Sequence, residues 1–396
     1  LNLQRFQFDY DLTFAVFFMN ADWTVYGRYG TRRSVKNAGA EMTKKGLAES
    51  MKRVLQLHQQ YPSERKRLVG KQPLPVKYRR PDEYPSLRGK FKKDLNYKGN
   101  VSRSCMHCHQ IRDAERQVFR NASRSIPDRS LLPNPSPRVL GIELDPRTRA
   151  TVAKVAGNSI AARAGIKKGD DIVTLGGQAI VSQADVQWVL HHAGAETQLP
   201  VQVLRNNGSQ RFTLTLTKGW RNATDISWRV TSWSLRRMVT GGILFAQATE
   251  KQRRSAGVAK GKMALVAKHV GQYGKHAVAK RAGFRKGDII VSFDGLDQDM
   301  TTSQLLAYGA RKTKPGQIIP VTVIPDGLTR AVSAAWAPAA NIAAAAVEFV
   351  RNFLRSIVLY WSIMVCLTVI RSTNGVSVHG NQTWRGCNRL VPHQDH

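Results

Sequence analysis

The most chemically specific stretch of the sequence is Ser104-Cys105-Met106-His107-Cys108-His109. Its Cys-x-x-Cys-His spacing is the pattern to which a c-type haem is attached. Two thiols one helical turn apart can add to the two vinyl groups of the porphyrin, and the adjoining imidazole can reach the iron as proximal ligand. The motif therefore predicts haem c on the cofactor-binding residues Cys105, Cys108 and His109, with His109 as the metal ligand.

Other kinds of site use the same residue types. Four side chains within five residues could chelate zinc: Cys105, His107, Cys108 and His109. Structural zinc sites usually draw on two separated ligand pairs, however, and no second pair lies nearby. The cysteines could instead form a redox dithiol, whose pKa would fall beside basic residues such as Arg103 and Arg112. A chance match of five residues is the remaining interpretation.

The sixth ligand of a haem iron is not evident from the motif. Met106 and His107 lie inside the motif, where neither can swing round to the far face of the porphyrin. A distal ligand would have to come from elsewhere in the chain, and the candidates are His191, His192 or none.

A second pattern occurs twice in the chain. AGIKKGDDIVTLGG at residues 164–177 returns almost letter for letter as AGFRKGDIIVSFDG at residues 282–295. Each copy has an Ala-Gly corner, a Lys-Gly-Asp turn and a short β-branched strand. Gly169 and Gly287 stand where the turn into that strand favours a residue free to take a positive φ. The repeat predicts two copies of one small domain.

The segments after each copy also correspond. A helix is expected over Ser182–Ala193 and again over Thr302–Arg311, each opened by a hydroxyl that can cap the first amides. A β-hairpin should then close each unit. The expected strands are 199–204 and 211–216 around Asn206-Asn207-Gly208, and 318–324 and 329–334 around Pro325-Asp326-Gly327.

This order of elements, with the motif A-G-[hydrophobic]-x-x-G-D-x-[IV]-[IV], resembles the PDZ family in its bacterial, circularly permuted form. In that family a hydrophobic-Gly-hydrophobic strand supplies amides that hold a peptide's terminal carboxylate, and the peptide adds a strand to the sheet edge. Arg138, just before the matching strand, is a candidate anion partner, while Val186 and Val189 should pack inward. The peptide-binding residues that the resemblance implies are Leu140, Gly141, Ile142, Gln183, Gln187 and Leu190.

The strand residues Leu140 and Ile142 can also be plain core residues, because groove and core share that strand. In the second copy, Gly241-Gly242-Ile243 stands at the corresponding strand. A long basic loop over residues 248–262 follows it, which disfavours a second peptide groove.

The N-terminal residues predict a hairpin followed by a helix. Strands are expected over 12–19 and 24–29, and a helix over 42–57 should bury one face. The residues of that face are Leu47, Met51, Val54 and Leu55. Hairpin then helix resembles the second half of thioredoxin-like domains of secreted bacterial proteins. The reactive cysteines of that family would lie upstream of Leu1, and Leu12 stands near its cis-proline, so the resemblance implies no thiol chemistry here.

Composition limits the partners. The chain has 396 residues, 61 Lys and Arg against 27 Asp and Glu, and a formal charge of +34. Such a charge attracts polyanions, but it is scattered over every segment and no nucleic-acid motif is present, so we expect no specific nucleic acid. Four cysteines are too few and too uneven for a disulfide scaffold. Because the chain begins with Leu1, we expect a fragment or a misassigned start.

These patterns predict a multidomain α+β chain in which a partial thioredoxin-like α/β piece precedes two PDZ-like β-sandwich or barrel modules. The tail contains a run of 15 largely apolar residues, 356–370, which is shorter than the about 20 that span a membrane. It favours either a marginal anchor touching anionic lipid or a packed tail. The expected segments are 1–60 thioredoxin-like, 61–103 a basic, Pro-rich exposed linker, 104–137 the Cys-x-x-Cys-His segment and joint, 138–220 and 221–336 PDZ-like, and 337–396 the tail.

The function that follows is a non-catalytic protein of the cell envelope, periplasmic or secreted, and anchored if the tail is a membrane segment. It would bind peptide C-termini or protein partners and carry a c-type haem. One alternative is a redox or electron-transfer protein centred on Cys105 and Cys108. Another is a regulatory piece of a serine protease system, because such modules often follow a trypsin-like domain in high-temperature-requirement proteases. No Gly-x-Ser-Gly-Gly nucleophile loop is present, which argues against a protease.

Overall fold

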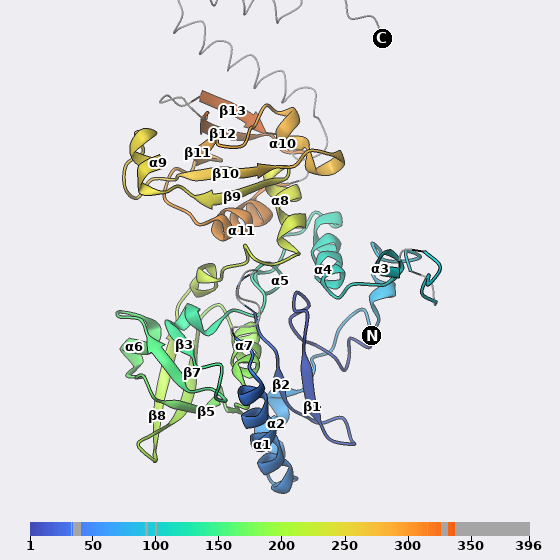
Figure 1. Ribbon diagram of the computed structural model, residues 1–396, viewed down its shortest axis with the longest axis vertical. Coiled ribbons are helices and arrows are strands. Elements are labelled where there is room, and N and C mark those ends of the chain that lie inside the picture. Colours follow the sequence, from blue (N-terminus) through green and yellow to red (C-terminus); the bar gives the residue numbers. More distant parts are fainter. Residues whose placement is uncertain are drawn as a thin grey trace, which may run out of the picture. The chain divides into compact units, whose positions relative to one another are not determined.

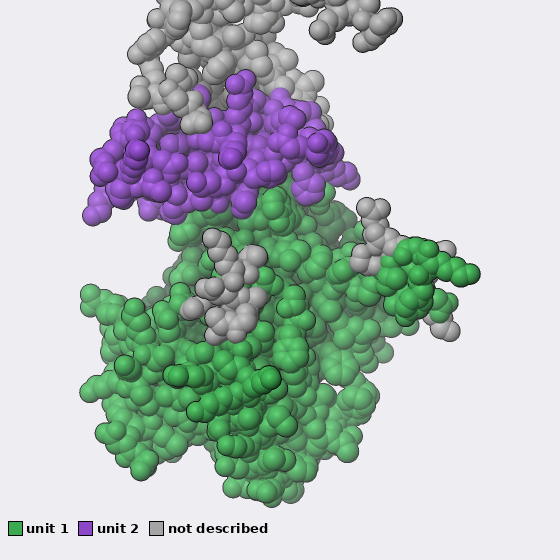
Figure 2. Space-filling view, viewed as in Figure 1, with its two compact units in different colours: residues 1–240, 300–315 green, residues 241–299, 316–396 purple. Residues whose placement is uncertain are grey.

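The computed structural model describes residues 1–32, 34, 41–91, 94–99, 101–314, 316–325 and 332–336. The chain divides into two compact units, residues 1–240 with 300–315, and residues 241–299 with 316–396 (Figure 2). Among the described residues, no helix is long and apolar enough to cross a membrane. The apolar stretch of the tail lies outside the described residues, so the anchor remains a prediction.

The first unit begins with the expected hairpin and helix. Strands β1 (Val16–Met19) and β2 (Val25–Tyr29) pair antiparallel. Helix α1 (Lys44–Gln59) follows, and the Thr43 side chain caps it by accepting the N–H of Gly46. The element order is confirmed. The thioredoxin resemblance stays a prediction, because hairpin and helix alone do not define that fold.

The buried face of α1 differs from the expected one. Met51 and Leu55 are 50% and 59% exposed, whereas Gly46, Ser50 and Leu57 are buried. A Cβ at Gly46 would lie 2.2 Å from the carbonyl oxygen of Pro146. Of the expected face, Leu47 and Val54 are half-buried, and Val54 packs against a buried cluster. Apolar spacing therefore predicted only part of the buried face, and missed the close approach at Gly46.

The segment expected as an exposed linker is partly buried, so that expectation was wrong. It contains short helices: α2 (Arg65–Leu68), η1 (Val69–Lys71), η2 (Pro81–Glu83) and α3 (Val101–Ser104). Leu68 and Lys71 are fully buried, and Tyr84 and Leu87 nearly so. The basic, proline-rich composition predicted solvent exposure, because the residues that cover this segment are distant in the sequence.

The next helices are α4 (His109–Asn121) and α5 (Asp128–Leu131). Helix α4 begins directly at His109. It buries Arg116 completely, and that guanidinium donates to the carbonyl oxygens of Ser130 and Thr231 at 2.9 and 3.1 Å. Carbonyl acceptors thus allow a charged side chain to lie in the interior.

The strands and helices of the first repeat copy lie within residues 137–216. They are η3 (Pro137–Leu140), β3 (Ile142–Leu144), β4 (Val152–Val155), α6 (Ile160–Ala164), β5 (Asp171–Leu175), β6 (Gln178–Ala179), α7 (Gln183–His192), β7 (Thr197–Arg205) and β8 (Gly208–Leu216). One sheet pairs β3 with β4, the other has the order β6-β5-β7-β8, and a Thr151–Asp171 bridge joins β4's end to β5. The expected turn is confirmed, with φ of 50° at Asn206 and 61° at Asn207.

Three further helices complete the first unit: η4 (Trp220–Ala223), α8 (Ser232–Thr240) and α11 (Thr302–Lys312). Helix α11 is capped by Thr301, one residue before the expected cap. A Cβ at Gly309 of α11 would lie 2.2 Å from a methyl group of Val239 on α8. These two helices are therefore closely packed.

The second unit contains β9 (Ile243–Gln247), α9 (Glu250–Ser255), β10 (Leu265–Val270), η5 (Gly274–His276), α10 (Val278–Arg281), β11 (Ile289–Phe293), β12 (Ile319–Ile324) and β13 (Val332–Trp336). Its sheet has the order β9-β10-β11-β12-β13. The final hairpin pairs as expected, with Ile319 opposite Trp336. Most of its predicted turn, at residues 326 and 327, lies outside the described residues.

The two repeat copies share backbone conformation and hydrogen bonds. Gly169 and Gly287 have φ of 91° and 99°, which confirms the prediction made for both turns. The N–H of Gly169 donates to the carbonyl oxygen of Val152 at 2.8 Å, and the N–H of Gly287 donates to that of Ala267 at 2.9 Å. The N–H of Lys167 donates to the carboxylate of Asp170, and the N–H of Arg285 donates to that of Asp288, both at 2.8 Å. The sequence repeat is thus also a repeat of local structure.

Candidate functional site

Helix α7 is the element around which the candidate groove is built. Ser182 caps it by accepting the N–H of Ala184 at 3.0 Å. Val186 and Val189 pack inward as predicted. Leu190, which was expected to face a peptide, is fully buried in the same core. Figure 1 shows α7 between the strands of this module and the hairpin β1–β2. One face of α7 is therefore turned toward the strands of the module and another toward the hairpin.

An ion pair fixes the hairpin-side face of α7. The Asp185 carboxylate lies 2.6 Å from the amine of Lys71, and both side chains are buried. Asp185 also accepts the backbone N–H of Val181 at 3.0 Å and of Arg28 at 3.2 Å. Burial lowers the pKa of Lys71 from its ordinary value, although Asp185 opposes this. The helix is thus bound to residues well outside its own module.

Aromatic contacts strengthen the same attachment. The indole N–H of Trp188 donates to the carbonyl oxygen of Gly70 at 2.8 Å. The guanidinium of Arg28 lies 3.6 Å from the ring centre of Trp188, within the range of a cation–π contact. Burial lowers the pKa of Arg28 to about 10.

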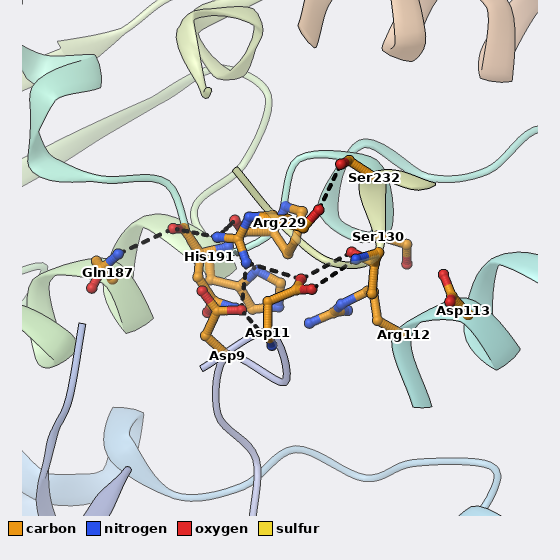
Figure 3. A network of polar contacts seen from close by, with 12 residues as sticks. Asp9, Asp11, Arg112, Asp113, Ser130, Gln187, His191, Arg229 and Ser232 are labelled. Atoms are coloured by element: carbon orange, nitrogen blue, oxygen red, sulfur yellow. Dashed lines mark hydrogen bonds and ion pairs between the residues drawn. The ribbon is translucent and has the colours of Figure 1, made fainter. Parts of the chain in front are cut away.

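The two glutamines predicted to face a peptide already have partners. Gln183 donates to the hydroxyl of Thr31 at 3.2 Å, and that hydroxyl donates to Gln187 at 2.8 Å. Gln187 in turn donates to the carbonyl oxygen of Asn134 at 3.3 Å (Figure 3). Thr31 and Asn134 were missed from the sequence, because no local pattern connects them with α7.

Arg229 anchors the network to which Asn134 belongs. Its guanidinium contacts the carboxylates of Asp9 and Asp11 at 2.5 and 3.2 Å and donates to the carbonyl oxygen of Pro133 at 2.9 Å (Figure 3). Burial alone would raise the pKa of Asp11, but Arg229 and the N–H of Thr231 lower it below its ordinary value. This network ties the first residues of the chain to the segment after the first module.

Strand β3 presents one edge that has no partner strand among the described residues. The carbonyl oxygen of Gly141 accepts the N–H of Ala156, and the N–H of Asp145 donates to the carbonyl oxygen of Thr151. The peptide groups of Gly141 and Asp145 therefore face β4. Because alternate residues of a strand point their peptide groups in opposite directions, those of Ile142 and Leu144 face away from β4. Within the described chain, β4 is the only strand paired with β3.

The loop before β3 is closed on itself. The N–H of Val139 donates to the Ser136 carbonyl at 3.0 Å, and that of Gly141 donates to the Arg138 carbonyl at 2.9 Å. Gly141 has φ of 84°, and a Cβ there would lie 2.1 Å from the Cβ of Ser159. Glycine is required at this position, and the loop's amides are satisfied internally.

The Cys-x-x-Cys-His motif lies at the start of α4. Cys105 is exposed, Cys108 is half-buried directly before the helix, and His109 is its first residue. Burial raises the pKa of Cys108, so the expectation of a thiol pKa lowered by Arg112 was wrong. Arg112 pairs with Glu115 at 2.5 Å instead. The side chain of Arg103 lies outside the described residues.

The donor atoms of the motif are two thiols and one imidazole. Both cysteines are free thiols, and Nδ1 of His109 is buried with no hydrogen-bond partner in the described chain. Burial, and then His107, lower the pKa of His109. Cys108 packs against an apolar cluster of Leu3, Tyr10, Tyr84, Leu87, Ile111 and Ala114. In the described part of the chain, no three His, Cys, Asp or Glu side chains come together as metal ligands.

The two histidines proposed as distal ligands are already hydrogen-bonded through Nδ1. His191 accepts the N–H of Asn134 at 3.2 Å, and Nδ1 of His192 lies 2.9 Å from the Trp188 carbonyl. Burial lowers the pKa of His191 well below its ordinary value and that of His192 to about 4. Both imidazoles are therefore neutral at pH 7.

The first repeat copy lies in a segment that matches a known family. Residues 138–216 match the family model described as PDZ domain. This chain therefore contains a PDZ domain over those residues, as the first repeat copy predicted.

One similar solved structure is described as "Crystal Structure of the HtrA3 PDZ Domain Bound to a Phage-Derived Ligand (FGRWV)". Its identity is 31%, with a TM-score of 0.15, over 16% of this chain and 60% of that chain. The chain thus covers less than two thirds of the length of that structure. No curated protein matches the chain.

Proposed function

We propose that this protein is a non-catalytic docking protein whose PDZ domain binds peptide or protein C-termini by adding a strand to β3. The observation that carries the proposal is the unpaired edge of β3 at Ile142 and Leu144. An extended chain can form main-chain hydrogen bonds to such an edge, while neighbouring side chains select its sequence. Because the other edge of β3 is already paired with β4, an added strand would bind at this edge.

Helix α7 forms the opposite wall of the groove. Because Gln183 and Gln187 hold Thr31 and Asn134, an incoming peptide gains little from the two glutamines. Recognition therefore depends on the backbone of β3 and on the end of the groove near Val139.

A proline substitution on β3 tests strand addition. Leu144→Pro removes the outward N–H, and proline is tolerated on an edge strand whose N–H faces away from the sheet. Leu144→Ala is the matched control, since it removes the same side chain and keeps the N–H. The full chain would first be screened against a C-terminal peptide library, and affinities would be measured by calorimetry.

We expect Leu144→Pro to weaken binding about tenfold, because a main-chain hydrogen bond contributes about 0.5–1.5 kcal/mol and the neighbouring register is disturbed. Leu144→Ala should weaken it less than about threefold. Equal affinities of the two variants would refute strand addition at β3. Gly141→Glu is unsuitable as a test, because the Cβ clash with Ser159 would disrupt the loop itself.

We further infer that residues 221–336 form a second PDZ-like module. Its support is the matching strand order and the equivalent bonds at Gly169 and Gly287. An experimental structure in which these two turns fail to superpose would refute it. We assign this module no peptide, since the basic loop 248–262 follows its Gly241-Gly242-Ile243 strand.

The motif residues support a haem-binding role as a second proposal. Cys105 and Cys108 would each form a thioether and His109 would bind the iron, which favours electron transfer over other roles. A pyridine haemochrome spectrum of protein made in a host with cytochrome maturation should show a covalent haem. Cys105→Ser with Cys108→Ser should abolish it, and zinc found by metal analysis with no haem band would refute it.

The proposed location is the cell envelope, periplasmic or secreted, with anionic membrane contact if the tail 337–396 is an anchor. Its support is the resemblance of the repeat to bacterial, permuted PDZ domains. The alternative of a regulatory piece of a serine protease system has the same support. Fractionation of cells producing the full-length gene product tests the location, and recovery only from the cytoplasm would contradict it.

A further inference from the structure

A pocket of about 320 Å³ lies at the C-terminal end of α7, beside the short helices α5 and η4. That volume is within the range of about 300–1,000 Å³ that is typical of small-molecule sites. The charged and aromatic residues of its wall are Asp128, Arg129, His191, His192, Trp220 and Arg221. No residue of β3 lines the pocket, so it is separate from the edge at which a peptide would be added.

Arg221 contributes a buried donor to this wall. The residue is only 5% exposed. Its Nη2 donates to the carbonyl oxygens of His191 and Ala193 at 2.8 and 2.7 Å, and its guanidinium lies 4.6 Å from the ring centre of Trp220. Nη1 is buried and has no hydrogen bond within the described chain. Because buried donors are normally satisfied, this nitrogen indicates a ligand that brings an acceptor oxygen.

The two imidazoles of the wall offer one donor and one acceptor. Nδ1 of His191 accepts the N–H of Asn134, so the neutral ring has its proton on Nε2. Nδ1 of His192 lies 2.9 Å from the carbonyl oxygen of Trp188. Because a carbonyl oxygen can only accept, the proton of His192 is on Nδ1, and its Nε2 is an acceptor.

The charge of the wall is positive. Asp128 is the one carboxylate of the lining, and it is already paired with Arg311 at 2.8 Å. Arg129 and Arg221 form no ion pair with any residue that the structure describes. Burial lowers the pKa of Arg221 to about 10, which leaves it charged at pH 7. Besides burial, the charges of Arg129 and Arg221 lower the pKa of both imidazoles, as expected where positive charge predominates.

We propose that this pocket binds a small phosphate monoester, whose phosphate is held by Arg221, Arg129 and the Nε2–H of His191. A phosphate monoester carries about −1.5 to −2 charges at pH 7, which matches the two guanidiniums that no carboxylate neutralises. The volume is about twice that of a roughly 150 Å³ cavity that holds benzene. An organic group therefore fits beside Trp220, where Nε2 of His192 can accept from a hydroxyl. This binding site goes beyond the docking function and does not rest on it.

The test is calorimetry of the full chain with three probes: phenyl phosphate, benzoate and inorganic phosphate. We expect phenyl phosphate to bind saturably at one site per chain. Benzoate has the same ring but only one charge, so it should bind at least tenfold more weakly. Inorganic phosphate has the charge but no ring, so it should bind at least threefold more weakly than phenyl phosphate.

Matched charge removals locate the site. Arg129→Gln should weaken phenyl phosphate binding at least fivefold, and its exposed side chain makes a loss of folding unexpected. Arg221→Gln should weaken binding at least tenfold, with a thermal melt as the check on folding, because Nη2 also holds the end of α7. Arg211→Gln removes the same charge from an exposed position on β8 and should leave the affinity unchanged.

Each contrary result overturns a stated part of the proposal. Equal weakening by Arg129→Gln and Arg211→Gln would show only attraction to the chain's overall charge of +34 and would overturn the pocket. Benzoate binding as tightly as phenyl phosphate would overturn the preference for phosphate. Inorganic phosphate binding more tightly than phenyl phosphate would replace the monoester by free phosphate. If Arg221→Gln does not fold, an unchanged affinity in Arg129→Gln is sufficient to refute the site.

Discussion

Replacing Asp185 by Asn removes one negative charge from α7 and keeps the shape of the side chain. It leaves Lys71 buried without its partner, which lies 2.6 Å away in the native protein. Breaking a buried ion pair from one side destabilises proteins by about 3–5 kcal/mol, because the remaining charge is uncompensated. We expect a loss of that size in the free energy of unfolding at pH 7.

The destabilisation by Asp185→Asn has an upper limit that depends on pH. The buried amine of Lys71 can become neutral by releasing its proton, and its pKa in the unfolded chain is 10.5. Neutralising it at pH 7 costs about 1.36 kcal/mol for each of 3.5 pH units, or about 5 kcal/mol. In Asp185→Asn the folded chain then binds one proton fewer than the unfolded chain, so its stability should rise with pH toward 10.5. The destabilisation measured at pH 9 should thus be about 2 kcal/mol.

Urea unfolding of the full chain at pH 7 and pH 9, followed by tryptophan fluorescence, measures both values. Asp82→Asn is the control, because Asp82 forms an exposed pair with Arg80 that should contribute at most about 1 kcal/mol. Lys71→Met in the Asp185→Asn background should recover most of the stability by removing the stranded charge. A loss below 1 kcal/mol in the single variant, or one independent of pH, would refute the buried pair as the clamp on α7.

Three further predictions concern stability and are measured by the same unfolding assay. Gly46→Ala should destabilise by about 1–2 kcal/mol despite its better helix propensity, since its Cβ meets the Pro146 carbonyl, whereas Gly157→Ala, with open space around it, should not; equal effects would contradict the close approach. Burial raises the pKa of Asp113 from 3.8 to about 6, so stability is lost as the pH rises from 3.8 to 6 and the loss is complete above 6. Asp113→Asn should therefore add about 1–3 kcal/mol at pH 7 and almost nothing near pH 4. A gain of the same size at both pH values would count against this. The pKa of His192 falls from 6.5 to about 4, so its neutral form contributes stability above pH 6.5 that is lost as pH falls toward 4; His192→Gln should remove about 2 kcal/mol of that loss, and an unchanged pH profile would disprove it.

Local sequence patterns predicted the parts of the fold that local physics determines. Gly169 and Gly287 take the positive φ that their turns require, and Ser182 caps α7. The turn at Asn206 and Asn207 follows from the tolerance of asparagine for left-handed backbone. In each case the deciding interaction lies within a few residues, which is why it can be recognised from the sequence.

The connections between segments could not be predicted. Arg229 lies 220 residues from Asp9, and Lys71 was assigned to solvent by its basic surroundings. Charged residues predict exposure unless their partner is known, and the partner is determined only by the tertiary fold. The same limit applies to α1, whose buried face depends on close approach to Pro146 as well as on apolar spacing. The peptide groove therefore stays a prediction from the sequence, and the contacts of Thr31 and Asn134 with α7 could not be predicted.

Hydrogen–deuterium exchange at Ile142 and Leu144 tests the central claim most directly. Both amides point away from β4 and lack partners in the described chain, so they should exchange quickly in the free protein. Saturation with a library-selected C-terminal peptide should slow both at least tenfold, while Glu143, which faces β4, changes little. Binding that leaves Ile142 and Leu144 unprotected, or that protects another strand edge, would contradict peptide addition to β3.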